Sequence, residues 1–109
     1  MTYLPQPYRR FERDFPHIDE AYGHLANLCH EAGPLDDKTR RLVKLGIALG
    51  LQSEGAIKSQ TRKALDAGAT PDEVRHACLL VLTTAGFPAM IAGMAWVEEV
   101  LEARTAGVA

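Results

Sequence analysis

Residues 61–80 read TRKALDAGATPDEVRHACLL, and this stretch carries the clearest signals for where helices end and begin. Gly68 follows an apolar helical stripe and is the residue type expected just beyond a helix C-terminus. A second helix signal comes at once: Thr70 can cap, Pro71 suits the first helical position, and Glu73 completes a capping box. The stretch therefore predicts two helices joined by a short turn.

Apolar residues continue at helical spacing on both sides of this turn. No segment alternates between apolar and polar residues as a half-buried strand does, so we predict an all-α fold of about five helices. The expected helices cover about residues 16–31, 36–51, 53–67, 70–86 and 87–104. Residues 1–15 lack an apolar period and are expected to form an N-terminal arm with one short turn of helix. Residues 16–109 are then a single helical domain.

Composition excludes several classes of protein. The chain has 109 residues and a formal net charge of −2, so neither nucleic acid nor an anionic membrane is an expected partner. The N-terminus lacks the apolar core of a signal peptide, and the longest apolar run, residues 87–97, is too short to cross a bilayer. We therefore expect a cytoplasmic protein whose two cysteines, Cys29 and Cys78, are reduced thiols.

The amount of apolar sequence predicts self-association. The segments 36–51, 70–86 and 87–104 are each apolar on most sides, and one domain of this size cannot bury all three. A homo-oligomer would cover the excess surface. The alternative is that only the segment 70–86 is central and that the others pack around it.

Three stretches resemble the carboxymuconolactone decarboxylase and AhpD-like family: LDDKTRRLVKLGIALG from residue 35, TRKALDAGATPDEVRHACLL from residue 61, and TTAGFPAMIAGMAWVEEVL from residue 83. The element AL-x-AGAT-P-x-E within the second stretch is the most specific. The resemblance implies an AhpD-like helical fold, assembled as a trimer or hexamer.

The redox branch of this family uses a glutamate, a C-x-x-C pair and a histidine four residues later, to reduce a partner through thiolate chemistry. The resemblance aligns the two cysteine positions with Ser53 and Ala56, the histidine with Gln60 and the glutamate with Arg41. None of these four residues can replace its counterpart, since alanine forms no thiolate and glutamine does not titrate. Dithiol reductase chemistry is therefore excluded at this site.

The decarboxylase branch of the family has a histidine at the position that Gln60 occupies in this chain. We expect Gln60, Lys58 and Ser53 to bind a small anionic lactone or carbonyl compound, because an amide and an ammonium can orient a carboxylate. His76 and Glu54 are the candidate catalytic residues for proton transfer. A structural role is open for each: a packed glutamine, a surface ion pair between Glu54 and Lys58, and an interface histidine.

The sequence leaves open whether the protein is an enzyme; if it is, we expect a decarboxylase-like lyase without thiol chemistry. The alternative is a non-catalytic oligomeric scaffold or ligand sensor. Peroxiredoxin-linked alkylhydroperoxidase activity ranks last, because Cys78 lies in the apolar run ACLLVL, where burial should raise its pKa. No cofactor motif is present, and the histidines of residues 17–30 do not share one helix face, so no metal site is expected.

Overall fold

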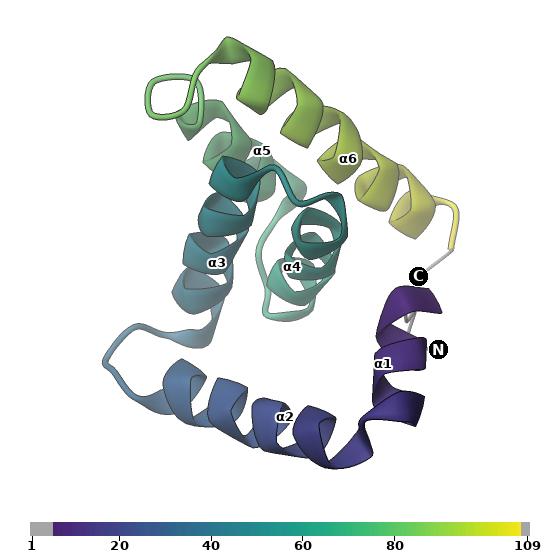
Figure 1. Cartoon of the computed structure of the whole chain (residues 1–109). Coiled ribbons are helices and arrows are strands. Elements are labelled where there is room, and N and C mark those ends of the chain that lie inside the picture. Colours follow the sequence, from purple (N-terminus) through teal and green to yellow (C-terminus); the bar gives the residue numbers. More distant parts are fainter. Residues whose placement is uncertain (1–5, 108–109) are drawn as a thin grey trace. The chain divides into compact units, whose positions relative to one another are not determined.

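The computed structural model describes residues 6–107, which are helical and contain no strand. The described elements are α1 (Gln6–Asp14), α2 (Pro16–Glu31), α3 (Asp37–Leu51), α4 (Glu54–Asp66), α5 (Pro71–Leu80) and α6 (Phe87–Thr105) (Figure 1). They form two compact units, of which the first ends at Leu35 and the second begins at Asp36. The predicted all-α class is confirmed.

The first unit consists of α1 and α2. The sequence predicted one short turn of helix in the arm, whereas α1 has nine residues. Tyr8, Phe11 and Phe15 recur at near-helical spacing, and the Phe11 and Phe15 rings lie 5.8 Å apart between centroids. The Tyr8 hydroxyl donates a hydrogen bond of 3.1 Å to Asp19 Oδ1 on α2. These aromatic and polar contacts explain the longer helix.

The second unit holds the core, in which each of the four helices packs against the other three. α4 packs most extensively against α3 and then against α6, while α5 lies against α6 and α3 (Figure 1). The side chains that fill the space between them are aliphatic or small: Leu45, Ala48, Leu49, Ile57, Ala64, Val74, Cys78, Met90, Val97 and Leu101. Thr61 is also fully buried, and its hydroxyl donates to the Ile57 carbonyl at 2.7 Å, which satisfies the group within α4.

The predicted helix boundaries follow from capping groups. Asp36 Oδ1 accepts the Thr39 amide at 2.8 Å at the start of α3. The capping box of α5 is complete, since Thr70 Oγ1 accepts the Glu73 amide and Glu73 Oε1 accepts the Thr70 amide. Gly68 has a φ of 98° in the turn between α4 and α5, a backbone conformation that favours glycine.

One expectation about the apolar helices was wrong in detail. The helix predicted to reach Gly86 ends at Leu80 and is followed by turns through Ala85. Leu79 and Leu80 are exposed in the single chain, as are Val43, Ile47 and Leu51 on α3, which agrees with the expectation that one domain cannot bury all of its apolar segments. The reason is geometric: a helix of this small unit has neighbours on part of its circumference only.

The Glu73 carboxyl should make the stability of the fold depend on pH. Hydrogen bonds from the Thr70 amide and from Lys38 Nζ, the latter 2.9 Å from Oε2, lower the pKa of the Glu73 carboxyl. A folded-state pKa below the unfolded value contributes stability above the unfolded pKa, and this stability is lost as the pH falls through the folded pKa. Glu73→Gln should therefore destabilise the fold at neutral pH. In acid, where the parent carboxyl is protonated, the difference between variant and parent should disappear.

The measurement is urea unfolding followed by circular dichroism at several pH values between neutrality and acid. Asp72→Asn is the matched control, because the exposed Asp72 carboxylate makes only a 3.6 Å ion pair with Arg75. A difference between Glu73→Gln and the parent that persists unchanged in acid would contradict the assignment.

Candidate functional site

Lys58 on α4 is held between two carboxylates. Its Nζ lies 2.7 Å from Glu54 Oε2 on the same helix and 2.5 Å from Glu99 Oε2 on α6. The hydrogen bonds from Glu54 and then Glu99 raise the pKa of Lys58, which keeps the amine charged. This ion cluster links α4 to α6. Lys58 was predicted to bind a substrate carboxylate, but Glu54 and Glu99 already neutralise its positive charge.

Gln60 lies on a different side of α4. Its Oε1 is buried, and no donor within residues 6–107 reaches that oxygen. A buried amide oxygen without a hydrogen bond costs about 1–3 kcal/mol. The oxygen can therefore accept a hydrogen bond from a further donor.

Lys63 stands one helical turn after Gln60, where α4 meets α3. Desolvation and the nearby charges of Arg41 and Lys44 lower the pKa of Lys63. Arg41 Nε lies 3.9 Å from Asp37 Oδ1, and Lys44 also has an interaction partner, whereas the Lys63 ammonium has none among the residues that the structure describes. Lys63 is exposed, so its ammonium is open to solvent or to an anion, and Gln60 lies one turn before it on α4.

His76 is exposed on α5 and lines a groove between α3 and α5 of about 520 Å³. The groove is mainly apolar, and Thr39, Glu73 and Thr84 supply polar atoms. None of the other four predicted site residues lines it. We call this feature the α3–α5 groove; its lining residues are Thr39, Leu42, Val43, Gly46, Ile47, Glu73, His76, Ala77, Leu80, Val81 and Thr84.

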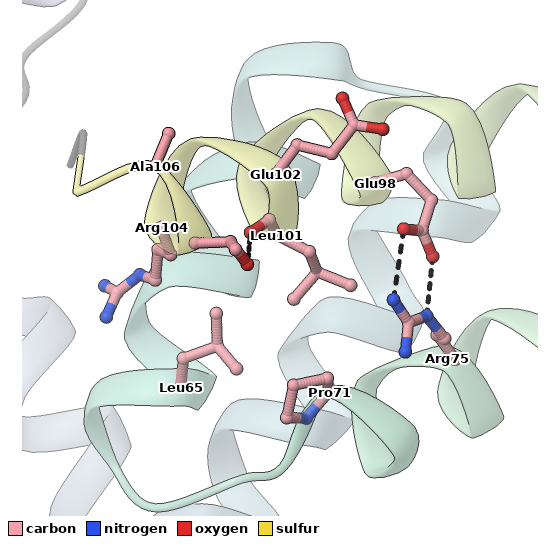
Figure 2. A pocket seen from close by; sticks show the side chains of 9 residues that line it. Leu65, Pro71, Arg75, Glu98, Leu101, Glu102, Arg104 and Ala106 are labelled. Carbon is pink, nitrogen blue, oxygen red and sulfur yellow. Dashed lines mark hydrogen bonds and ion pairs between the residues drawn. The ribbon is translucent and has the colours of Figure 1, made fainter.

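A second groove of about 590 Å³ lies where the ends of α4 and α6 meet the start of α5 (Figure 2). Arg75 on its rim donates two hydrogen bonds to the Glu98 carboxylate in a bidentate ion pair, with distances of 2.6 and 3.2 Å. Arg104 similarly lies 2.8 Å from Asp66 Oδ1. These basic groups are already neutralised, and the groove contains none of the predicted site residues.

Of the five predicted site residues, only Glu54 and Lys58 contact each other, through their ion pair. Ser53 is the N-cap residue of α4, and its side chain makes no capping hydrogen bond there. Helical periodicity separates Lys58 from Gln60 by about 200° around α4, since each residue advances the helix by about 100°. Lys63 was missed by the sequence analysis; its position three residues after Gln60 was the available signal.

Cys78 is fully buried in the core, and burial raises the pKa of its thiol to about 11. Cys29 is exposed on α2. At pH 8 a thiol of this raised pKa is about one part in a thousand thiolate, whereas a free cysteine is about a quarter thiolate. The expectation of a raised thiol pKa at Cys78 is confirmed.

We expect Cys78 in Cys29→Ser protein to react with iodoacetamide at least roughly 100-fold more slowly than free cysteine at pH 8, because the thiolate is the nucleophile. Mass spectrometry of timed samples measures the rate, and the same protein unfolded in urea is the control. A native rate close to the unfolded one would contradict this prediction and revive peroxide chemistry at Cys78.

No helix within residues 6–107 is long and apolar enough to cross a bilayer. Likewise, the described part of the chain contains no group of three or more histidine, cysteine or carboxylate side chains placed to hold a metal ion.

The comparisons with known proteins agree with this fold and sequence pattern. Residues 16–99 match the model of the carboxymuconolactone decarboxylase family. This chain belongs to that family. Protein MJ1511 of Methanocaldococcus jannaschii is 34% identical over 91 residues, which are 84% of this chain and 82% of that protein. Protein MJ0742 of the same organism is 34% identical over 86 residues, covering 78% and 83%.

Among solved structures, the chain is similar to apo-lpg0406, a carboxymuconolactone decarboxylase family protein from Legionella pneumophila. The TM-score is 0.75 at 22% identity, covering 86% of this chain and 84% of that one. This likeness confirms the fold. With cysteines at positions 29 and 78 only, this family member has no C-x-x-C pair.

Proposed function

We propose that this family member binds a small anionic lactone or carbonyl compound on the side of α4 that carries Gln60, without thiol chemistry. The observation that supports this best is the buried Gln60 oxygen, which has no hydrogen-bond partner in the described chain. A protonated acid, hydroxyl or amide group of a ligand could satisfy that oxygen. Lys63, one turn away, would pair with the ligand's carboxylate.

The proposal retains Ser53 and Lys58 as ligand-binding residues and Glu54 and His76 as proton-transfer residues. Ser53 directly precedes α4, and its side chain is not used as a cap. Glu54 can exchange a proton only if Lys58 and Glu99 rearrange, because Lys58 holds it at 2.7 Å. His76 is the more accessible of the two candidates for proton transfer.

Binding is tested by calorimetric titration with a panel of lactone carboxylic acids and their neutral methyl esters. We expect an acid to bind and its ester to bind more weakly. Lys63→Met should weaken acid binding roughly tenfold or more, since a hydrogen bond to a charged group contributes about 1.5–3 kcal/mol. Gln60→Ala should also weaken binding.

Lys58→Met is the companion variant to Lys63→Met: each removes one ammonium from α4, and the pair shows which of the two lysines binds the anion. If Lys58→Met abolishes binding while Lys63→Met leaves it unchanged, the anion lies on the α6 side and the role of Lys63 is wrong. If no acid of the panel binds, or if acid and ester bind equally, the proposed ligand class is wrong.

The second candidate is a non-catalytic scaffold or ligand sensor. It is favoured because Glu54 is engaged by Lys58 and because His76 lines a groove that contains none of the other predicted site residues. Mass spectrometric detection of product separates the two: turnover that His76→Ala or Glu54→Ala abolishes supports the enzyme. Binding without turnover in the parent protein supports the sensor.

Homo-oligomerisation, as a trimer or hexamer, is part of the same proposal. Large apolar side chains that are exposed on both compact units support it. Light scattering coupled to size-exclusion chromatography gives the mass directly, and a monomer at micromolar concentration would contradict it.

A further inference from the structure

The four lysines of this chain differ in their surroundings. Lys38 and Lys58 each form an ion pair with glutamate carboxylates. Lys44 also has an interaction partner. Lys63 differs from these three, because within residues 6–107 the charged groups that act on it are cations. Of the four lysines, Lys63 is therefore the one whose ammonium form the described chain stabilises least.

The surroundings of Lys63 favour the neutral amine. α4 packs most extensively against α3, which brings Lys63 near Arg41 and Lys44. Desolvation, and then the charges of these two cations, lower the pKa of the Lys63 ammonium. The side chain is nevertheless exposed, so a small molecule can reach it. A lysine beside other cations is a better nucleophile than an ordinary lysine, since only the neutral amine has a free electron pair.

Arg41 can hold an anionic group beside this amine. Its Nε lies 3.9 Å from Asp37 Oδ1, which is too long for a hydrogen bond, and Asp37 is exposed to water. A guanidinium has five N–H donors in an arrangement that matches a carboxylate. Arg41 is therefore able to bind the carboxylate of a ligand that reaches Lys63.

Gln60 provides a hydrogen-bond acceptor on the same side of α4. Lys63 follows Gln60 by three residues, and residues three apart are neighbours on the surface of a helix. The buried Gln60 Oε1 has no donor within residues 6–107. This oxygen can accept a hydrogen bond from the N–H and O–H groups that form when an amine adds to a carbonyl.

We propose that the Lys63 amine forms an imine with the carbonyl group of a 2-oxo acid, whose carboxylate Arg41 binds. This inference rests on the ligand-binding side of α4 proposed above, and it names one class of carbonyl compound for that side. In a 2-oxo acid the carbonyl carbon is bonded directly to the carboxylate carbon. A carboxylate held between Arg41 and Lys63 therefore places its carbonyl group next to the Lys63 nitrogen.

The reaction balances without a further co-reactant. The Lys63 ammonium first loses a proton to water, and the freed electron pair of nitrogen attacks the carbonyl carbon. A C–N bond forms, and one proton moves from nitrogen to the former carbonyl oxygen. This hydroxyl then takes back a proton from solvent, the C–O bond breaks and water leaves. The nitrogen electron pair completes the C=N bond, so that the iminium keeps one N–H and the positive charge.

Reductive trapping with pyruvate and sodium cyanoborohydride at pH 8 tests the proposal, since the hydride converts an imine into a stable amine. Peptide mass spectrometry of timed samples gives the rate at each lysine of the whole chain. We expect Lys63 to be modified at least roughly tenfold faster than Lys58, because each pKa unit changes the neutral fraction tenfold and two carboxylates raise the pKa of Lys58. Unfolding in guanidinium chloride should abolish this preference.

Acetone is the matched probe, because it has the carbonyl group and lacks the carboxylate. The preference for Lys63 over Lys58 should be roughly two- to fivefold greater with pyruvate than with acetone, the range for an exposed ion pair. Arg41→Met should slow the modification of Lys63 by pyruvate. Arg41→Lys, which keeps the positive charge, should restore most of the rate. Circular dichroism shows whether both variants are folded.

Equal modification of the four lysines in the folded protein, or faster modification of Lys58 than of Lys63, would overturn the imine. An equal preference with pyruvate and acetone would overturn the 2-oxo acid as its partner, and an unchanged rate in Arg41→Met would overturn the role of Arg41. Lactone acids that bind in the calorimetric titration while pyruvate shows no preference for Lys63 would remove the imine alone. Selective trapping at Lys63 without binding of any lactone acid would support the imine and remove the lactone.

Discussion

Leu49→Ala is expected to destabilise the second unit by about 2–5 kcal/mol, the range for removing a buried leucine side chain from a packed core. Leu49 is 0% exposed and lies on α3 opposite Gly93 of α6. The substitution removes apolar contacts and leaves a cavity that neighbouring helices fill only in part. Urea unfolding monitored by circular dichroism gives the free energy of unfolding.

Leu51→Ala is the matched control, since it makes the same chemical change two residues later on α3, where the side chain is 73% exposed. We expect a change within about 0.5 kcal/mol there. Equal losses for the two variants would mean that α3 is not packed as the structure shows.

Gly93→Val is expected to destabilise the protein by about 3 kcal/mol, at the upper end of the usual range for overpacking. A Cβ atom at position 93 would overlap Leu49 Cδ2. Leu49 is buried on all sides and cannot turn away without displacing other core residues. The backbone fixes the position of this Cβ atom, so no rotamer of the new side chain avoids the overlap, and the two methyl groups of valine add further bulk.

Gly50→Ala is the control for glycine replacement, because a Cβ atom at position 50 meets nothing within 4 Å and alanine favours the helix. It should stabilise the fold slightly. The double variant Leu49→Ala, Gly93→Val should lose less stability than the sum of the single losses, since the valine enters the space that the leucine leaves. Additive losses would show that the two positions are not in contact.

Membership of the carboxymuconolactone decarboxylase family does not bring the redox mechanism to this chain. Serine and alanine occupy the positions that resemble the cysteine pair, and both thiols lie elsewhere, one of them buried with a pKa of about 11. The residues that offer ligand chemistry instead are an amide and a cation, Gln60 and Lys63. The function proposed above accordingly involves anion binding rather than thiol-based electron transfer.

The sequence by itself determined the helices and most of their ends. The turn at Gly68 and the capping box at Thr70 and Glu73 are local features, because the groups that hydrogen-bond are within three residues of each other. Burial of Cys78 was equally predictable, because an apolar run surrounds it in the sequence. Such features need no knowledge of which helices become neighbours.

Only the tertiary structure decided which charges remain available. Lys58 and Lys63 both lie on α4. Lys58 forms an ion pair with Glu99 from α6, whereas Lys63 lies near cations of α3 that lower its pKa. Likewise, Ile47 and Leu49 both belong to the apolar run of α3, yet Ile47 is exposed and Leu49 is buried. The physical reason is that burial and electrostatic pairing depend on the neighbouring helices, and residues distant in the sequence supply these neighbours.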